Sequence, residues 1–156
     1  MNKLSIITIH KGPTKDLIKT INSVANQNHI PYDHLIISPK IPVYLKDRYN
    51  KKYIKYIIGR DNSIYNAMNI GLNLTKKRSI LFLNSGDVFF NKDCVKNIYE
   101  AINKNPNKIN IFKIILKHNK NYYIPRKSYF YSKKYFPHPC FIRPPIFINK
   151  NFIKFE

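Results

Sequence analysis

The sequence predicts an α/β fold in which a mostly parallel, Rossmann-like sheet is flanked by helices. The first observation is a series of short, β-branched apolar runs with little polar alternation, typical of strands buried on both faces. The second is that segments with apolar residues at helical spacing separate these runs. Strands that alternate with helices form βαβ units and parallel sheets. After about residue 117 the alternation stops, and an irregular region of strands and loops is expected.

The first expected strand and helix occupy the first 27 residues. Residues 4–9 read LSIITI, and a Gly-Pro pair ends this run at residues 12–13. Thr14 is expected to cap a helix that continues to about Gln27, with Asp16 in its first turn, where a negative charge is favourable. Its apolar residues recur at helical spacing: Leu17, Ile18, Ile21, Val24 and Ala25.

The second and third expected strands are His34–Ser38 and Tyr53–Ile58. A helix is expected over 62–74, because residues 61–63 read DNS and all three are good capping residues. One face of this helix carries its apolar residues: Ile64, Ala67, Met68, Gly71 and Leu72.

The fourth expected strand is Ser79–Leu83, and the polar sequence NSGD follows it at 84–87. Asp93 is expected to cap one more helix. The apolar face of that helix consists of Val95, Ile98, Tyr99 and Ile102. A further strand is expected over Ile109–Leu116.

Residues 118–156 differ in composition from the rest of the chain, although no linker separates them from it. Basic and aromatic residues alternate there, and prolines at 125, 137, 139, 144 and 145 interrupt any helix. We therefore expect one domain in two parts, an α/β core over 1–117 and an irregular continuation over 118–156.

The composition is strongly basic, with 28 Lys and Arg against 8 Asp and Glu and a net charge of +20. Such a charge is compatible with a nucleic-acid-binding module, and the basic and aromatic tract over 120–143 could contact single strands or membrane headgroups. However, Ile, Lys and Asn dominate the composition, and all three have A/T-rich codons. Genomic base bias is therefore the alternative source of the charge.

Several classes of protein are excluded by simple counts. A hydrophobic content of 44% is too high for a disordered chain, and no apolar run approaches the ~18 residues that span a bilayer. Cys94 and Cys140 form no metal-ligand pair, and the histidines show no zinc spacing. The first apolar run is too short for a signal peptide. The expected location is the cytoplasm, with the cytoplasmic face of the membrane as the alternative.

Acidic residues are so few that carboxylate chemistry has few candidates: Asp16, Asp33, Asp47, Asp61, Asp87, Asp93, Glu100 and Glu156. Asp61 and Asp87 each follow an expected strand. Because open α/β sheets bind ligands beyond the carboxyl ends of their strands, the two side chains would share one rim. A carboxylate there suits a divalent cation whose other ligands are mostly water and phosphate. The alternatives are that Asp61 only caps a helix and that Asp87 only forms an Asx-turn.

Two motifs give the sequence a family resemblance. Residues 60–71 read RDNSIYNAMNIG, and residues 80–87 read ILFLNSGD. They resemble the family 2 glycosyltransferases, in the branch that builds bacterial surface polysaccharides, with the patterns D-x-G-I-Y-D-A-M-N-x-G and F-L-N-S/A-G-D. The opening strand and residues 20–27, TINSVANQ, also resemble this family.

The resemblance implies a GT-A fold, a nucleotide-diphosphate sugar donor, Mg²⁺ or Mn²⁺, and inverting transfer of a hexosyl group to a glycan or lipid-linked acceptor. It implies that Asp87 holds the metal ion, that 1–117 binds the donor and that 118–156 begins the acceptor side. It also implies a set of donor-binding residues: Arg60, Asp61, Tyr65, Asn66, Met68, Asn69, Asn84, Ser85 and Gly86.

The sequence also departs from the family pattern. The second strand of the family ends in a turn that carries carboxylates, whereas residues 36–40 read IISPK. The general base of the family is an Asp beyond a turn that residues 151–156 resemble. His138, in a weak match to a family strand, and Glu156 remain as candidates for a base. We therefore expect a truncated transferase domain, and a catalytically inactive remnant of the fold is the alternative.

Overall fold

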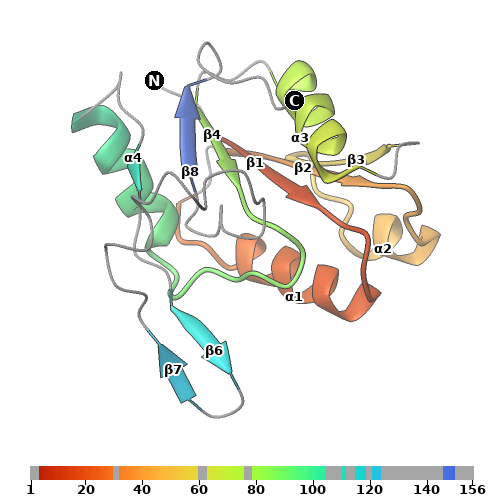
Figure 1. The fold of residues 1–156 in the computed structure, drawn as a ribbon, viewed down its shortest axis with the longest axis horizontal. Coiled ribbons are helices and arrows are strands. Elements are labelled where there is room, and N and C mark those ends of the chain that lie inside the picture. Colours follow the sequence, from red (N-terminus) through yellow and green to blue (C-terminus); the bar gives the residue numbers. More distant parts are fainter. Residues whose placement is uncertain are drawn as a thin grey trace.

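The computed structural model describes residues 4–29, 32–59, 63–75, 79–104, 110–111, 115–118, 121–123 and 146–149. Six strands form its central sheet: β1 (Leu4–Ile9), β2 (Tyr32–Ser38), β3 (Ile54–Ile58), β4 (Ser79–Phe82), β5 (Asn110–Ile111) and β8 (Ile146–Asn149). They lie in the order β3-β2-β1-β4-β8-β5 (Figure 1). A separate antiparallel pair consists of β6 (Leu116–His118) and β7 (Asn121–Tyr123).

The strands β1 to β4 form the parallel part of the sheet. β1 pairs in parallel with both β2 and β4, and β2 pairs in parallel with β3. β8 lies between β4 and β5 and is antiparallel to both. All residues of β1 and β4 are buried, as expected for apolar strands that helices cover on both faces. The predicted α/β fold with a mostly parallel sheet is confirmed.

In the part of the chain that the structure describes, four helices cover the sheet: α1 (Thr14–Ala25), α2 (Val43–Arg48), α3 (Ile64–Leu74) and α4 (Cys94–Lys104). α3 packs on one face, where Met68 lies in one cluster with Ile7 and Ile37. α1, α2 and α4 pack on the opposite face (Figure 1). Within the described residues, no helix has the length and hydropathy to span a membrane.

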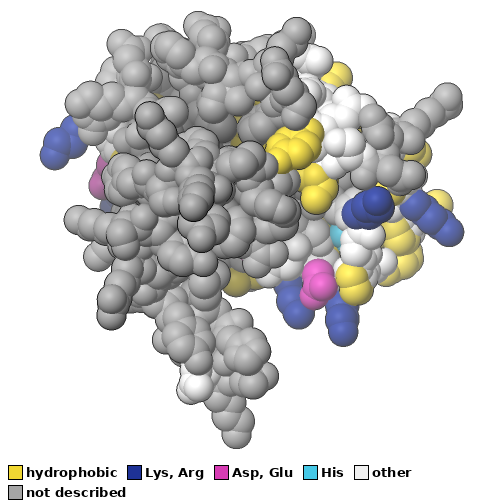
Figure 2. All heavy atoms as spheres, viewed as in Figure 1, with side chains coloured by type: hydrophobic (Ala, Val, Ile, Leu, Met, Phe, Trp, Pro, Cys, Tyr) yellow, Lys and Arg dark blue, Asp and Glu magenta, His cyan; other side chains and the backbone are white. Residues whose placement is uncertain are grey.

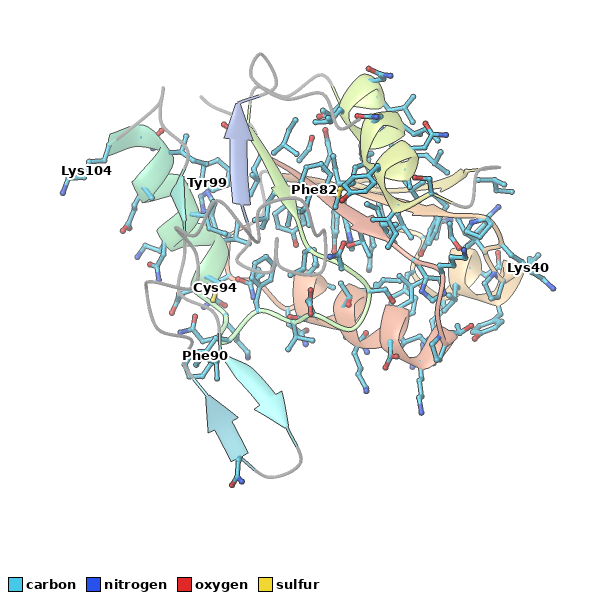
Figure 3. All side chains as sticks on the ribbon, in the orientation of Figure 1. Lys40, Phe82, Phe90, Cys94, Tyr99 and Lys104 are labelled. Carbon is cyan, nitrogen blue, oxygen red and sulfur yellow. The ribbon has the colours of Figure 1, made fainter. Side chains whose placement is uncertain are left out.

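Tyr99 fastens α4 to the sheet. Figure 3 shows its side chain projecting from the helix toward the strands, and its hydroxyl oxygen accepts the Leu4 amide at 3.0 Å. Burial is the main cause that raises the pKa of Tyr99. The phenol therefore stays neutral and satisfies a backbone donor at the start of β1.

The predicted helix caps have three outcomes. The cap at Ser63 is confirmed, because its side chain accepts the Asn66 amide at 3.4 Å. The cap at Thr14 is wrong: Thr14 already lies in α1, and Pro13, in an extended conformation, is the N-cap without a side-chain hydrogen bond. Proline suits this place because it has no amide hydrogen to leave unpaired. Asp61 and Asn62 lie outside the described residues.

The cap of α4 comes from a distant part of the chain. Asp93 precedes the helix, and its carbonyl accepts the Asn97 amide at 2.9 Å. The Val95 amide, however, donates to Gln27 Oε1 at 3.0 Å. The carboxylate of Asp93 accepts a hydrogen bond from the Asn28 side chain at 3.0 Å. The predicted side-chain cap by Asp93 is therefore replaced at Val95 by a residue that follows α1.

Two predictions of regular structure are corrected. The sequence does not predict α2, a six-residue helix that begins after Pro42 and buries only Leu45. The single strand predicted over Ile109–Leu116 is wrong, because Asn110–Ile111 pairs with β8 whereas Leu116 belongs to the β6–β7 pair. An apolar run alone does not indicate where a chain changes sheets. The division at residue 117, which falls inside β6, stays a prediction.

Gly71 is the point of closest approach between α3 and the sheet. A Cβ atom at this position would lie 2.7 Å from Ile7 Cγ2 and 3.0 Å from Ile37 Cδ1. We expect Gly71→Ala to lower the free energy of unfolding by ~1–3 kcal/mol, because overpacking exceeds the gain of ~1 kcal/mol in helix propensity. Urea denaturation measures this change.

Gly12 provides the matched control for this substitution. A Cβ atom at Gly12 would meet no atom within 4 Å, and the residue is exposed. Gly12→Ala should therefore change the free energy of unfolding by less than ~0.5 kcal/mol. Equal effects of the two substitutions would contradict the close packing of α3 on β1 and β2.

Candidate functional site

The carboxyl ends of β1, β2 and β4 meet at one edge of the sheet, which we call the carboxyl edge. Backbone hydrogen bonds continue past the ends of the strands there: His10 N donates to Ile37 O at 2.9 Å, and Ser85 N donates to Ile9 O at 3.2 Å. These bonds hold the segments after β1 and β4 side by side. The segments after β1 and β4 therefore meet at this edge, where open α/β sheets bind ligands. The rim that the sequence predicts for Asp61 and Asp87 stays a prediction, because Asp61 lies outside the described residues.

The segment that follows β4 is a tight turn over residues 84–87, which we call the Asp87 turn. The Asp87 amide donates to Asn84 O at 2.9 Å, and Gly86 has a φ of 97°. A positive φ at the third position of a four-residue turn favours glycine, because a Cβ atom would be strained there. The sequence Asn-Ser-Gly-Asp thus fixes where the Asp87 backbone lies relative to the end of β4.

Thr20 of α1 holds the Asp87 turn through hydrogen bonds to its backbone. Its side chain is fully buried, and its Oγ1 accepts the Gly86 amide at 2.9 Å. The same hydroxyl donates to Asp87 O at 2.9 Å. The helix α1, which packs on one face of the sheet, therefore sets the position of the turn at the carboxyl edge.

His10 connects the end of β1 with the same turn. Its Nδ1 lies 2.9 Å from Ser85 Oγ, and its side chain is buried. Burial lowers the pKa of His10, and the nearby Asp16 carboxylate opposes this change. The imidazole is therefore neutral at pH 7 and able to share a hydrogen bond with Ser85 as either donor or acceptor.

A small pocket of about 20 Å³ opens at the carboxyl edge, between the strand ends and the start of α3. Its lining residues come from the ends of β1 and β2, from the segments that follow β1, β2 and β3, and from the start of α3: Ile9, His10, Lys11, Ile37, Ser38, Pro39, Gly59, Ser63, Ile64 and Ala67. The volume admits about one water molecule. Because the N-terminus of α3 borders it, the helix dipole favours a negatively charged ligand group at this place.

The end of β2 lacks a carboxylate, as the sequence indicates. Ser38 Oγ instead donates to the Lys40 carbonyl at 2.8 Å and closes a local turn. Figure 3 shows Lys40 directed outward at the rim of the molecule. The polar groups that β2 offers to the pocket are therefore neutral ones.

The donor-binding residues expected on α3 have different environments. Met68 is fully buried in the core and packs against the sheet, so its side chain does not line the carboxyl edge. Tyr65 is half-buried and packs against the same cluster, and Asn66 and Asn69 are half-buried as well. The other expected site residues on or near this helix, Arg60 and Asp61, lie outside the described residues, as do His138 and Glu156.

The atoms of the Asp87 turn fit a hard divalent cation. Asn84 Oδ1 is buried and has no hydrogen-bond partner among the described residues. Carboxylate and amide oxygens are ligands that Mg²⁺ and Mn²⁺ accept, with water and phosphate completing the shell. In the described part of the chain no three His, Cys, Asp or Glu side chains gather to form a cage made of protein alone. The donor set therefore fits an ion that is shared with a phosphate-bearing ligand.

Sequence reasoning places His10 directly after the first strand but misses its contact with Ser85, and it assigns Thr20 no role in this site. A signal for Thr20 exists in the sequence, since Thr20, Ser23 and Gln27 form a polar line at i, i+3 and i+7 beside an apolar helix face. The contact between His10 and Ser85 gives no local signal, because the two residues lie 75 positions apart in the chain.

Most charged side chains around the visible part of this region are basic. Figure 2 shows Lys and Arg side chains along the rim where α1 and α2 lie, with few acidic ones among them. Lys11, Lys15 and Lys40 are exposed there. A rim of this sign raises the local concentration of anions.

Comparisons with known proteins are consistent with these features. The sequence model of the family named Glycosyl transferase family 2 matches residues 5–154. Residues 1–349 of S. aureus TarS superpose with a TM-score of 0.72 at 16% identity, covering 95% of this chain and 47% of that one. The same TarS fragment in complex with UDP-GlcNAc gives 0.71 at 17% identity, covering 95% and 45%.

A more distant solved structure is the mannosyltransferase PcManGT from Pyrobaculum calidifontis, in complex with GDP-Man and Mn²⁺. It has a TM-score of 0.58 at 6% identity, and the match covers 64% of this chain and 32% of that one. At such identities the likeness shows a shared fold. The chain spans between about a third and a half of the length of these solved structures. No curated protein matches the chain.

Proposed function

Because this chain belongs to glycosyl transferase family 2 and has the GT-A fold, we propose that it binds the diphosphate of a nucleotide-sugar donor at the carboxyl edge, beside Asp87. The family assignment supports glycosyl transfer from a nucleotide sugar. The observation that carries the proposal for this chain is the Asp87 turn, which Gly86 shapes and which Thr20 and His10 hold at the ends of β1 and β4.

The metal ion is part of the proposal. Asp87 and Asn84 would hold Mg²⁺ or Mn²⁺, and the ion would offset the charge that develops on the departing nucleoside diphosphate. The Mn²⁺ bound by the PcManGT structure supports this choice. The chain itself contributes a basic rim and the positive end of the α3 dipole, both of which favour binding of the anionic donor.

The remaining features of the reaction are proposals as well. We infer inverting transfer, in which an acceptor hydroxyl of a glycan or lipid-linked substrate displaces the nucleoside diphosphate in one step. The residues that would take the hydroxyl proton, His138 and Glu156 among them, lie outside the described part. The excess of Lys and Arg is compatible with work at the cytoplasmic face of a membrane, where anionic headgroups attract basic surfaces.

Calorimetric titration of the full chain tests donor binding. The ligands are UDP, UDP-GlcNAc, GDP and GDP-Man, each with Mn²⁺ and again with EDTA, since the solved relatives hold UDP-GlcNAc or GDP-Man. We expect at least one ligand to bind, and to bind at least about tenfold more tightly with Mn²⁺, because Asp87 would hold an ion that offsets the charge of the diphosphate. Absence of binding by all four ligands, or equal affinities with EDTA, would contradict the proposal.

A further inference from the structure

Two polar side chains on one face of α1, Thr20 and Ser23, and that of Gln27 just after the helix lie along the segment that follows β4. Ser23 Oγ accepts the Phe89 amide at 2.7 Å. Gln27 Nε2 donates to Asn91 O at 2.8 Å, and Gln27 Oε1 accepts the Val95 amide. These bonds hold the chain from the Asp87 turn to the start of α4 against α1 and the residues directly after it.

Thr20 differs from the other two residues in what it holds. Its hydroxyl accepts from Gly86 N and donates to Asp87 O, each at 2.9 Å. These two backbone groups lie on either side of the Asp87 Cα atom. Holding both of them restricts the backbone rotations that would move the Asp87 side chain toward or away from the carboxyl edge.

The burial of Thr20 makes these bonds decisive for the turn. The side chain is fully buried, so water does not replace a lost partner easily. Further carbonyl oxygens lie close to the same hydroxyl, that of Asp16 at 3.2 Å and that of Asn84 at 3.4 Å. A hydroxyl has a single hydrogen, and the shortest of the three contacts is the one with Asp87 O.

We propose that Thr20 is a positioning residue for the metal and nucleotide site, acting through the backbone of Gly86 and Asp87. The inference rests on the proposed function, because it assigns Asp87 to a metal ion shared with the donor diphosphate. Ser23 and Gln27 hold the same segment further from the turn and should affect stability without affecting the site.

The test compares Mn²⁺ binding by full-length variants in the presence of UDP. The loss of the free Mn²⁺ signal in electron paramagnetic resonance reports binding. Thr20→Val keeps the shape of the side chain and removes both hydrogen bonds, and we expect about tenfold or weaker binding of Mn²⁺. Thr20→Ser keeps the hydroxyl and should restore binding to within about threefold of the unsubstituted chain.

Ser23→Ala is the matched control, since it removes one hydrogen bond between α1 and the same segment. We expect it to lower the urea midpoint about as much as Thr20→Val and to leave Mn²⁺ affinity within about threefold. Thr20→Ala cannot overpack the site and replaces Thr20→Val in the test if that variant does not fold. We expect it to weaken Mn²⁺ binding by the same factor as Thr20→Val.

The outcomes separate this inference from the function on which it rests. If Thr20→Val or Thr20→Ala binds Mn²⁺ with UDP as tightly as Ser23→Ala does, Thr20 has no positioning role, although the proposed function stands. If the unsubstituted, folded chain binds no Mn²⁺ with UDP or GDP, the proposed function fails, and this inference fails with it. Tenfold weakening that Thr20→Ser reverses supports the positioning role.

Discussion

Replacing Asp87 by asparagine is expected to abolish the Mn²⁺-dependent part of nucleotide binding, with an affinity loss of at least about 100-fold. Asp87 lies at the end of the Asp87 turn, whose backbone Thr20 and the Asn84 carbonyl hold in place. An amide at this position keeps the size of the side chain but removes the negative charge that a divalent cation requires. Calorimetry with UDP or GDP, with and without Mn²⁺, measures the loss.

Asp47→Asn provides a control with the same change of charge. Asp47 lies on α2 and is exposed, away from the Asp87 turn. The substitution should leave nucleotide affinity within about twofold, because solvent and salt screen the charge of an exposed carboxylate. If Asp87→Asn binds the metal nucleotide as tightly as Asp47→Asn does, Asp87 is not the metal ligand.

The second large effect is a loss of stability at acidic pH, and His34 is its source. His34 lies on β2, is fully buried, and its Nε2 is 2.8 Å from Thr8 Oγ1. Its Nδ1 is buried and has no hydrogen-bond partner among the described residues. Burial lowers the pKa of His34 to about 3, compared with 6.5 for the unperturbed group. Between these two pKa values His34 is therefore protonated in the unfolded chain but not in the folded one.

The sign of the effect follows from these two pKa values. Above pH 6.5 the histidine is neutral in both states, and its contribution to stability is fully present. As the pH falls from 6.5 toward 3, the unfolded state binds one more proton, and the free energy of unfolding drops by about 1.4 kcal/mol per pH unit. Urea denaturation at several values between pH 7.5 and pH 4.5 measures this slope.

A variant without the imidazole isolates the contribution of His34. His34→Gln keeps a polar group near Thr8 but does not titrate. As the pH falls below 6.5, its free energy of unfolding should therefore decrease less steeply than that of the unsubstituted chain, by the slope that corresponds to about one proton. His10, whose pKa burial also lowers, adds a contribution of the same sign in both proteins and cancels in the comparison. Equal slopes for the two proteins would show that His34 binds protons equally in the folded and unfolded states, which would contradict the lowered pKa.

The part of the fold that the sequence predicts is the part governed by local pattern. β1 and β4 consist of continuous apolar runs, and such runs indicate strands buried on both faces. α2 could not be predicted in this way, because a helix of six residues with one buried side chain shows no amphipathic period. The cap of α4 by Gln27 joins residues 68 positions apart, and local pattern carries no trace of it.

The candidate site follows the same division. The Asp87 turn was predictable, because the polar sequence NSGD at 84–87 follows an apolar strand, and the open sheet binds ligands at that end. Met68 fits a family motif, yet its position on the helix face that meets the sheet places it in the core. His10 and Thr20 act through contacts with residues 66 or more positions away, which only the folded chain shows.

The position of β8 has a consequence for the order of folding. Every strand pair among β1 to β4 is complete within residues 4–82, so this parallel half can assemble as soon as that part of the chain has left the ribosome. β4 is then an open edge, and β5 has no neighbour, until residues 146–149 arrive and insert between them. During synthesis the nascent chain therefore exposes the open edge of an apolar strand, which is the kind of surface that chaperones recognise.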